Sequence, residues 1–232
     1  MRRMANTRQR TQWEPENYAK HGERDLVGAG ILAQTRSMTN LRPPADQLPR
    51  RGNALTRLLG RAVLRLAGWK IEGEVPNLPK LVAVVAPHTS NWDFAIGVAG
   101  MFALGIRVTF LGKDTLFRWP VGPVMRWLGG VPVNRHSPNN VVEQTVDFVR
   151  RTDRVVVGLS PEGTRRKLPA WRTGYYFVAR GAGVPIVPVA LDYSRHRIRI
   201  FPVHCPADTV ERDMAKLGRL FHARMARYPA QY

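Results

Sequence analysis

A histidine and an aspartate five residues apart are the first side chains in this sequence that suggest a definite chemistry. His88 follows an apolar run that ends at Pro87, and Asp93 opens the apolar stretch that comes next. Five residues along a helix separate two side chains by about 140°, so the two can meet only if His88 lies on a loop that folds back on the helix start. The carboxylate would then hold one imidazole nitrogen, and the other nitrogen could take a proton from a hydroxyl. Such a pair would suit general-base chemistry at neutral pH, and a histidine in an ordinary strand-to-helix loop is the alternative at this point.

A second segment, residues 161–167 (PEGTRRK), brings a carboxylate, a hydroxyl and three cations together directly after the apolar run 155–159. Gly163 permits backbone conformations that other residues resist. Arg165 can bind a phosphate through two parallel hydrogen bonds. Glu162 could line such a site or could be a structural carboxylate that ties the loop together. The segment therefore predicts a tight turn that is suited to binding a phosphate.

Short apolar runs alternate with amphipathic stretches around these two motifs. Runs such as Leu81–Ala86 lack an in-out alternation, which is typical of strands buried on both faces of a sheet. We therefore expect an α/β domain with a mixed, mostly parallel sheet flanked by helices. The expected strands are 70–75, 81–86, 107–111, 131–133, 154–159, 185–191 and 196–201. The expected helices are 94–104, 114–128, 139–152, 171–181 and 208–228.

The N-terminal region differs from the rest of the chain. Residues 1–50 are polar and basic without a periodic pattern, and they predict a flexible arm ahead of a domain at 51–232. Within residues 53–69 the apolar side chains recur at the spacing of one helix face, and arginines occupy other positions. Such an amphipathic helix could lie in a membrane interface or pack onto the domain core, and both interpretations stay open.

Composition narrows the choice of partners. Lys and Arg number 36 against 17 Asp and Glu, and this net charge of +19 would attract nucleic acid or an anionic membrane surface. No segment resembles a helix-turn-helix, a zinc finger or an RNA-binding aromatic motif, so no nucleic acid is expected. Cys205 is the single cysteine, which predicts a reducing compartment and neither a disulfide within the chain nor a zinc site. The chain lacks a run of about 18 apolar residues and the apolar segment of a secretory signal, so any membrane contact is expected to be peripheral.

The sequence resembles the glycerolipid acyltransferases typified by lysophosphatidate acyltransferase, over about residues 53–205. Four blocks carry the resemblance in the family's order: His88–Asp93, Lys113–Arg135, Pro161–Arg165 and Val184–Val189. Pro87 stands where the family usually has asparagine, and Ser160 stands where it usually has an aromatic residue. The Asn91-Trp92-Asp93 form of the first block resembles a divergent bacterial branch of the family.

The resemblance implies transfer of a fatty acyl group from acyl-CoA or acyl-acyl carrier protein to the free hydroxyl of a lysophospholipid. It favours 1-acyl-sn-glycerol-3-phosphate as the acceptor, which would give phosphatidic acid. It implies His88 as the base with Asp93 as its partner, and neither a metal nor a redox cofactor. Ser90 then hydrogen-bonds the loop and is not a nucleophile. The residues that the resemblance implies at the acceptor site are Lys113, Arg135, Glu162, Gly163, Thr164 and Arg165.

The resemblance also implies a peripheral enzyme at the cytoplasmic face of the cell membrane, which takes its lysophospholipid from an anionic bilayer. Trp119, Trp127, Phe117 and Leu128 could contact lipid, and we expect at least half of them to pack in the core instead. Two alternatives stay open. The acceptor could be a different lysolipid or an aminolipid, or the protein could be a non-catalytic basic protein that binds lipid or nucleic acid.

Overall fold

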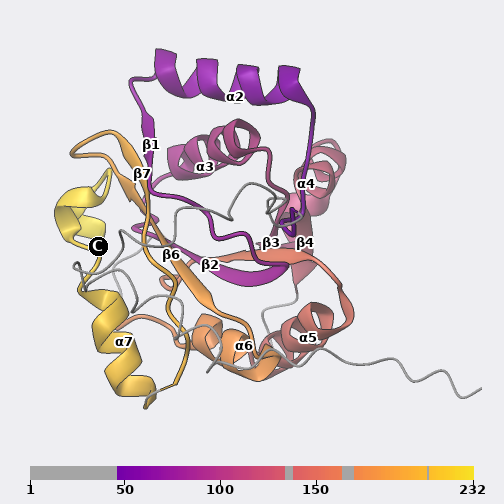
Figure 1. Ribbon diagram of the computed structural model, residues 1–232, viewed down its shortest axis with the longest axis vertical. Coiled ribbons are helices and arrows are strands. Elements are labelled where there is room, and N and C mark those ends of the chain that lie inside the picture. The colour runs from indigo at the N-terminus through magenta and orange to yellow at the C-terminus, as the bar shows by residue number, and fades with distance from the viewer. Residues whose placement is uncertain (1–45, 134–137, 164–169, 208) are drawn as a thin grey trace, which may run out of the picture. The chain divides into compact units, whose positions relative to one another are not determined.

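The computed structural model describes residues 46–133, 138–163, 170–207 and 209–232 (Figure 1). Most of the expected basic arm, residues 1–45, lies outside this part of the chain. Residues 46–232 form one unit, which therefore begins a few residues before the domain boundary expected from the sequence.

Seven strands form one mixed sheet in the order β1-β7-β6-β2-β5-β3-β4. All neighbouring strands are parallel except β6 and β7, which are antiparallel. The strands are β1 Lys70–Glu72, β2 Lys80–Ala86, β3 Val108–Lys113, β4 Gly130–Val133, β5 Val155–Leu159, β6 Ile186–Asp192 and β7 Arg197–Ile200. This arrangement confirms the predicted mixed, mostly parallel sheet.

Helices cover both faces of the sheet. They are α2 Ala54–Leu66, α3 Asn91–Leu104, α4 Gly122–Leu128, α5 Pro138–Arg151, α6 Gly174–Ala182 and α7 Val210–Gly218, with short 3-10 helices η2 Asp114–Phe117, η3 Ala223–Met225 and η4 Pro229–Gln231. In Figure 1, α2 and α3 lie on one side of the sheet, and α5 and α6 lie on the other. None of the helices in the described part of the chain has the length and apolar character that crossing a bilayer requires.

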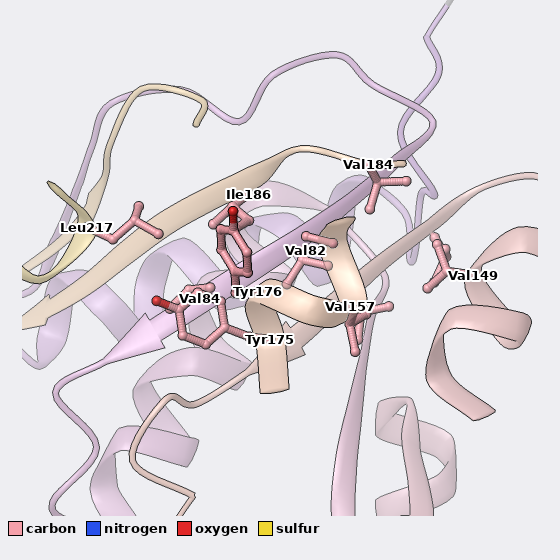
Figure 2. Close-up of a cluster of buried hydrophobic side chains, with 12 residues drawn as sticks. Val82, Val84, Val149, Val157, Tyr175, Tyr176, Val184, Ile186 and Leu217 are labelled. Atoms are coloured by element: carbon pink, nitrogen blue, oxygen red, sulfur yellow. The ribbon is translucent and has the colours of Figure 1, made fainter. Parts of the chain in front are cut away.

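The central strand β2 shows why its sequence is apolar without alternation. Val82 lies in register with Val157 of β5 on one side and with Ile186 of β6 on the other. These three side chains belong to a buried cluster that also contains Tyr176 of α6 and Leu217 of α7 (Figure 2). The alternate residues of β2 pack into separate buried clusters on the opposite face. Both faces of β2 therefore need apolar side chains, as a covered parallel sheet requires.

Helix α2 packs closely on α3 because of a glycine. A Cβ atom on Gly60 would lie 2.5 Å from the backbone nitrogen of Ala103, so only a residue without a side chain fits this contact. Gly60 and Leu64 are the buried residues of α2. The helix therefore contacts the domain along a narrow strip.

The predicted helix 114–128 is wrong in one respect, because the chain forms η2 and α4 with a turn between them. Pro120 lies in that turn. Proline has no backbone N–H and its ring clashes with the preceding helical turn, so a continuous helix would be interrupted there.

The predicted helix 208–228 is also too long. Helix α7 ends at Gly218, and the chain then bends into η3. Phe221 and Met225 are buried against Ala86 and Ala190 beyond α7. Burying both side chains against the sheet thus outweighs the local helical pattern.

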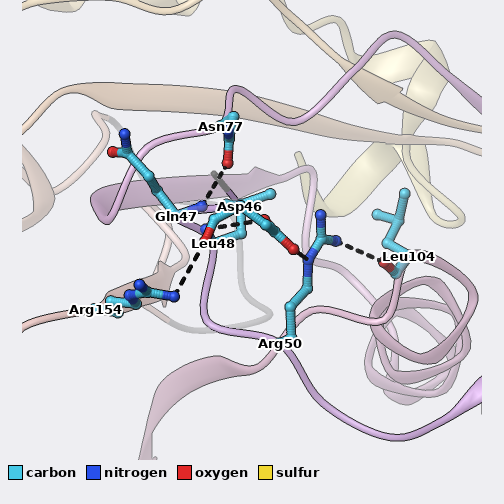
Figure 3. A network of polar contacts seen from close by, with 7 residues as sticks. All are labelled: Asp46, Gln47, Leu48, Arg50, Asn77, Leu104 and Arg154. Carbon is cyan, nitrogen blue, oxygen red and sulfur yellow. Dashed lines mark hydrogen bonds and ion pairs between the residues drawn. The ribbon is translucent and has the colours of Figure 1, made fainter. Parts of the chain in front are cut away.

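The segment that leads into α2 is tied to the domain by polar contacts (Figure 3). The Gln47 backbone N–H donates to Asn77 Oδ1 at 2.8 Å, and Arg154 Nη1 donates to the Asp46 carbonyl at 3.1 Å. Leu48 is buried in the same cluster as Leu81 and Ala83 of β2. The start of α2 is therefore fixed relative to the sheet.

Candidate active site

The carboxyl ends of four neighbouring parallel strands meet at one edge of the sheet, in the order β6, β2, β5, β3. Strand β2 runs into the loop of His88, and β5 runs into the loop of Glu162. Strand β3 ends at Lys113, and Tyr193 directly follows β6. In open α/β sheets, ligands bind in the crevice beyond these carboxyl ends. The topology therefore gathers residues from four separate parts of the chain at one candidate site.

The start of α3 fixes the aspartate. Asp93 Oδ2 accepts a hydrogen bond from the Ser90 backbone N–H at 2.7 Å, and Ser90 Oγ accepts one from the Trp92 N–H at 3.2 Å. This reciprocal cap satisfies N–H groups that a helix start leaves unpaired, and the helix dipole favours a negative charge there. Asp93 thus lies in the first turn of α3, which begins three residues before the predicted start, and Ser90 hydrogen-bonds the loop as expected.

The loop before α3 folds back as the spacing requires. His88 Nδ1 lies 3.4 Å from Asp93 Oδ2. The Asp93 side chain is 0% exposed, whereas the His88 side chain is 31% exposed. A buried carboxylate therefore lies behind an imidazole that solvent or a ligand can reach.

Tyr193 completes the surroundings of Asp93, and sequence reasoning missed it. Its hydroxyl donates to Asp93 Oδ1 at 2.7 Å. Burial and this bond to a carboxylate raise the pKa of Tyr193 above its ordinary value, so the hydroxyl keeps its proton and stays a donor. The two residues are 100 positions apart, so no spacing rule connects them. The available signal was a tyrosine two residues after the strand predicted at 185–191.

The C-terminal segment lies against the same loop. The Tyr228 backbone N–H donates to Thr89 Oγ1 at 3.2 Å, and the guanidinium of Arg227 lies 5.6 Å from the ring centre of Trp92 and 5.7 Å from that of Tyr193. Cation–π contacts of this kind add stability at partly exposed sites. The segment therefore supports both the His88 loop and the tyrosine on Asp93.

Glu162 links the two loops that carry the motifs. Its Oε2 accepts a hydrogen bond from the His88 backbone N–H at 2.6 Å, and the side chain is buried. Burial raises the pKa of Glu162 to about 7, with a smaller contribution from repulsion by Asp93. Among the described residues, its Oε1 is buried without a hydrogen-bond partner. Glu162 thus has the structural contact expected of a loop-tying carboxylate, with one oxygen left for a further partner.

Gly163 has the conformation that its residue type suggested. Its φ is +60°, a left-handed value that favours glycine, and a Cβ atom there would lie 3.2 Å from the Arg172 side chain. The turn is closed by the Gly163 N–H, which donates to the Ser160 carbonyl at 3.2 Å. The next two predicted residues, Thr164 and Arg165, lie outside the described part of the chain.

Of the other two cations expected at the acceptor site, Lys113 and Arg135, the structure describes only Lys113. Lys113 is exposed at the carboxyl end of β3 and lies in register with Val133 of β4. Arg135 follows Val133 by two residues and lies outside the described residues. The structure therefore brings Lys113 to the same edge of the sheet as His88 and Glu162.

The donor set at this edge can move a proton and can neutralise an anion. A histidine backed by a carboxylate can take a proton from a hydroxyl, and a lysine can pair with a negatively charged group. In the described ranges, no three His, Cys, Asp or Glu side chains group as a metal site needs.

Comparisons with known proteins identify relatives of this chain. A family model described as Acyltransferase matches residues 71–192, just over half of the chain. The 1-acyl-sn-glycerol-3-phosphate acyltransferase of Haemophilus influenzae is 28% identical over 156 residues, covering 63% of this chain and 63% of that protein. The protein of the same name from Escherichia coli K12 is 29% identical over 149 residues, covering 60% of this chain and 59% of that protein.

A solved structure shows the same fold. The crystal structure of the 1-acyl-sn-glycerophosphate acyltransferase of Thermotoga maritima superposes with a TM-score of 0.52 at 17% identity, over 72% of this chain and 75% of that chain. The chain belongs to the acyltransferase family, and the matched region contains His88, Asp93 and Glu162. The chain spans about three fifths of the length of the two curated relatives.

Proposed function

We propose that this protein transfers a fatty acyl group from acyl-CoA or acyl-acyl carrier protein to the free hydroxyl of a lysophospholipid. The proposed acceptor is 1-acyl-sn-glycerol-3-phosphate, which would give phosphatidic acid. The observation that carries the proposal is the contact of His88 with the buried Asp93 at the carboxyl edge of the sheet. The names of the Haemophilus and Escherichia relatives support the choice of acceptor.

In the proposed reaction, His88 takes the proton of the acceptor hydroxyl as its oxygen attacks the thioester carbonyl carbon. The tetrahedral intermediate then collapses, the carbon–sulfur bond breaks, and His88 returns the proton to the departing sulfur. Asp93 lies beside Nδ1 and stabilises the imidazolium that forms. Tyr193 is a positioning residue in this scheme, because its hydrogen bond holds the Asp93 carboxylate.

The acceptor phosphate would bind on the β5 and β3 side of His88. Lys113 lies on that side, and we assign Arg135 and Arg165 to the same phosphate on the strength of the family resemblance. Glu162, Gly163 and Thr164 would shape the loop around it. A pKa of about 7 lets Glu162 carry a proton for part of the time at neutral pH, which weakens its repulsion of an anionic headgroup. Lys113 or a backbone amide would stabilise the oxyanion of the intermediate.

We also propose a peripheral location at the cytoplasmic face of an anionic membrane, and helix α2 supports the contact with the membrane. Its apolar side chains are mostly exposed, and Leu66 is 88% exposed. The exposed apolar residues are Leu55, Leu58, Leu59, Val63 and Leu66. The helix also carries three arginines and no acidic residue. An apolar face beside cations is the pattern of a helix that lies in a bilayer interface, and this favours lipid over the core as the partner of α2.

The first experiment measures thiol release from acyl-CoA and from acyl-acyl carrier protein with a panel of lysophospholipids. The panel includes lysophosphatidate and a monoacylglycerol, which has no phosphate. We expect turnover with lysophosphatidate, weak turnover with monoacylglycerol, and loss of turnover in His88→Ala. His204→Ala is the matched control, because His204 contacts a buried aspartate elsewhere in the fold.

Each other outcome points to a named alternative. Equal turnover in His88→Ala would refute the base assignment. Preference for a different lysolipid or an aminolipid would keep the reaction and change the acceptor. If the protein shows no turnover and binds nucleic acid with an affinity that falls steeply with salt, and if His88→Ala leaves that affinity unchanged, a basic binding protein is favoured.

A further inference from the structure

The segment between β3 and β4 exposes an unusual amount of apolar surface. We call the exposed apolar residues of η2, α4 and the turn between them the tryptophan patch; they are Leu116, Trp119, Val121, Val124 and Trp127. Trp119 is 87% exposed and Trp127 is 63% exposed. Phe117 and Leu128 of the same segment are buried, so half of the four residues considered for lipid contact pack in the core. The segment is therefore held to the domain by Phe117 and Leu128, and its other side exposes apolar side chains to solvent.

The charge around the patch is mainly positive, and the exposed Asp114 at the start of η2 is the one acidic residue between Lys113 and Val133. Arg118 and Arg126 are exposed beside the two tryptophans, and Lys113 directly precedes η2. From Thr115 to Val133 the sequence contains no aspartate or glutamate. Tryptophan rings prefer the headgroup level of a bilayer, and arginines beside them pair with lipid phosphates. This combination of apolar surface and positive charge complements an anionic bilayer.

The patch lies beside the start of α2. Arg51, just before α2, donates from Nη2 to the Trp127 carbonyl, and its guanidinium lies 4.3 Å from the Trp127 ring centre. The same guanidinium lies 5.3 Å from the ring centre of Phe102, which belongs to α3 beneath α2. Figure 1 shows α4 below the N-terminal end of α2. Arg51, which directly precedes the N-terminal end of α2, therefore links α4 to α3.

We propose that the tryptophan patch is a second lipid-binding surface, which inserts Trp119 and Trp127 at the headgroup level of an anionic bilayer. This inference extends the proposed function and rests on it, because the proposed function includes an anionic membrane as a partner. Insertion would bring Lys113, immediately before η2, to the depth at which lysophospholipid phosphates lie. The patch would then steer the acceptor headgroup from the bilayer to the carboxyl edge of the sheet.

The test measures binding of the full chain to vesicles of phosphatidylglycerol and phosphatidylethanolamine by co-sedimentation, with phosphatidylcholine vesicles for comparison. We expect Trp119→Ser to weaken binding to the anionic vesicles by about tenfold, and Trp119→Phe to restore most of it. Phe148→Ser is the matched control, because Phe148 is an exposed aromatic on α5, across the sheet from α2. Circular dichroism and thermal unfolding establish that each variant is folded.

A second readout follows the environment of Trp119 directly. The difference in emission between the wild type and Trp119→Phe isolates this indole, and we expect brominated lipids to quench it. Vesicle binding of Trp119→Ser equal to that of the wild type, with no quenching by brominated lipid, would overturn the proposal.

Other occupants of the patch give different results. Acrylamide that fails to quench Trp119 without vesicles would mean that another part of the chain covers the patch. A change of oligomeric state in Trp119→Ser, with unchanged vesicle binding, would assign the patch to a second copy. Both results overturn the lipid proposal. Vesicle binding needs no turnover, so absence of acyl transfer would refute the proposed function and leave this result standing.

Discussion

The histidine and aspartate at the carboxyl edge, His88 and Asp93, have a counterpart elsewhere in the fold with nearly the same partners. His204 Nε2 lies 3.1 Å from Asp213 Oδ1, and the Tyr176 hydroxyl donates to Asp213 Oδ2 at 3.0 Å. In both places a buried aspartate lies between a histidine and a tyrosine. The side chains alone therefore do not distinguish a candidate catalytic pair from a structural one.

The surroundings of the two histidines distinguish them. The backbone of His204 pairs with Ile186, the first residue of β6, so this pair lies at the opposite end of β6 from Tyr193. Asp213 belongs to α7, and the contact ties that helix to the sheet. The His204 side chain is 18% exposed, against 31% for His88. We infer that position at the carboxyl edge and access from outside make the first pair a candidate base, and that the second stabilises the fold.

The largest expected effect separates the two pairs by activity. His88→Ala should lower kcat/KM by about 10²- to 10⁴-fold, because the acceptor hydroxyl loses its base. The free energy of unfolding should change by less than about 1 kcal/mol, because Asp93 keeps its hydrogen bonds from the Ser90 N–H and the Tyr193 hydroxyl. Thiol-release kinetics and chemical denaturation measure the two quantities. Loss of activity to the same degree in His204→Ala would end the distinction.

The next effect concerns Glu162, which contacts the first pair only. Its pKa is about 7 in the folded protein against 4.5 ordinarily, so the unfolded chain loses this proton at a lower pH. The stabilising contribution is thus complete below about pH 4.5 and is lost as the pH rises to about 7. Glutamine has no proton to lose. The stability of Glu162→Gln relative to the wild type should therefore rise by up to about 3 kcal/mol between pH 4.5 and pH 7.5.

Urea denaturation at several pH values measures this difference. Asp147→Asn is a suitable control, because Asp147 is exposed on α5 and pairs with the exposed Arg151 one helical turn away. A difference between Glu162→Gln and the wild type that stays constant across this pH range would contradict the raised pKa.

Mutation of the second pair, His204 and Asp213, should change the stability of the protein and not its activity. His204→Ala removes the partner of a buried carboxylate and should lower the free energy of unfolding by about 1–3 kcal/mol. At temperatures well below unfolding, kcat/KM should stay within about twofold of the wild type. Denaturation curves and thiol-release assays on the same preparation measure both. An unchanged denaturation midpoint would show that the contact with Asp213 does not stabilise α7.

The smallest expected effect compares the two tyrosines. Tyr193→Phe removes the hydroxyl on Asp93 and should lower kcat by about 5- to 30-fold with little change in KM, since the base is less well oriented. The acidic limb of the pH–rate profile should also move, because Asp93 then interacts differently with His88. Tyr176→Phe should lower stability by about 1 kcal/mol and leave that profile in place. Identical pH–rate profiles in Tyr193→Phe and the wild type would remove Tyr193 from the site.

Local patterns predicted the elements well where the pattern and the packing agree. The apolar run of β2 is a local signal and forms a strand as expected, and Asp93 lies at the start of α3, where its place before an apolar stretch suggested a helix start. The predicted helix 208–228 is wrong beyond Gly218, because Phe221 and Met225 pack against Ala86 and Ala190. No local pattern in the sequence indicates that contact. In the same way, 53–69 predicted an amphipathic helix but could not say which of its faces the domain would bury.

By itself, the sequence indicated that His88 and Asp93 could pair, because five residues across a loop and a helix start allow them to meet. It also determined the turn at Gly163, since a left-handed φ favours glycine. Only the tertiary structure decided which further side chains surround Asp93. Tyr193 and Glu162 reach the pair because β6 and β5 flank β2 in a parallel sheet, and strand order is set by packing between distant segments.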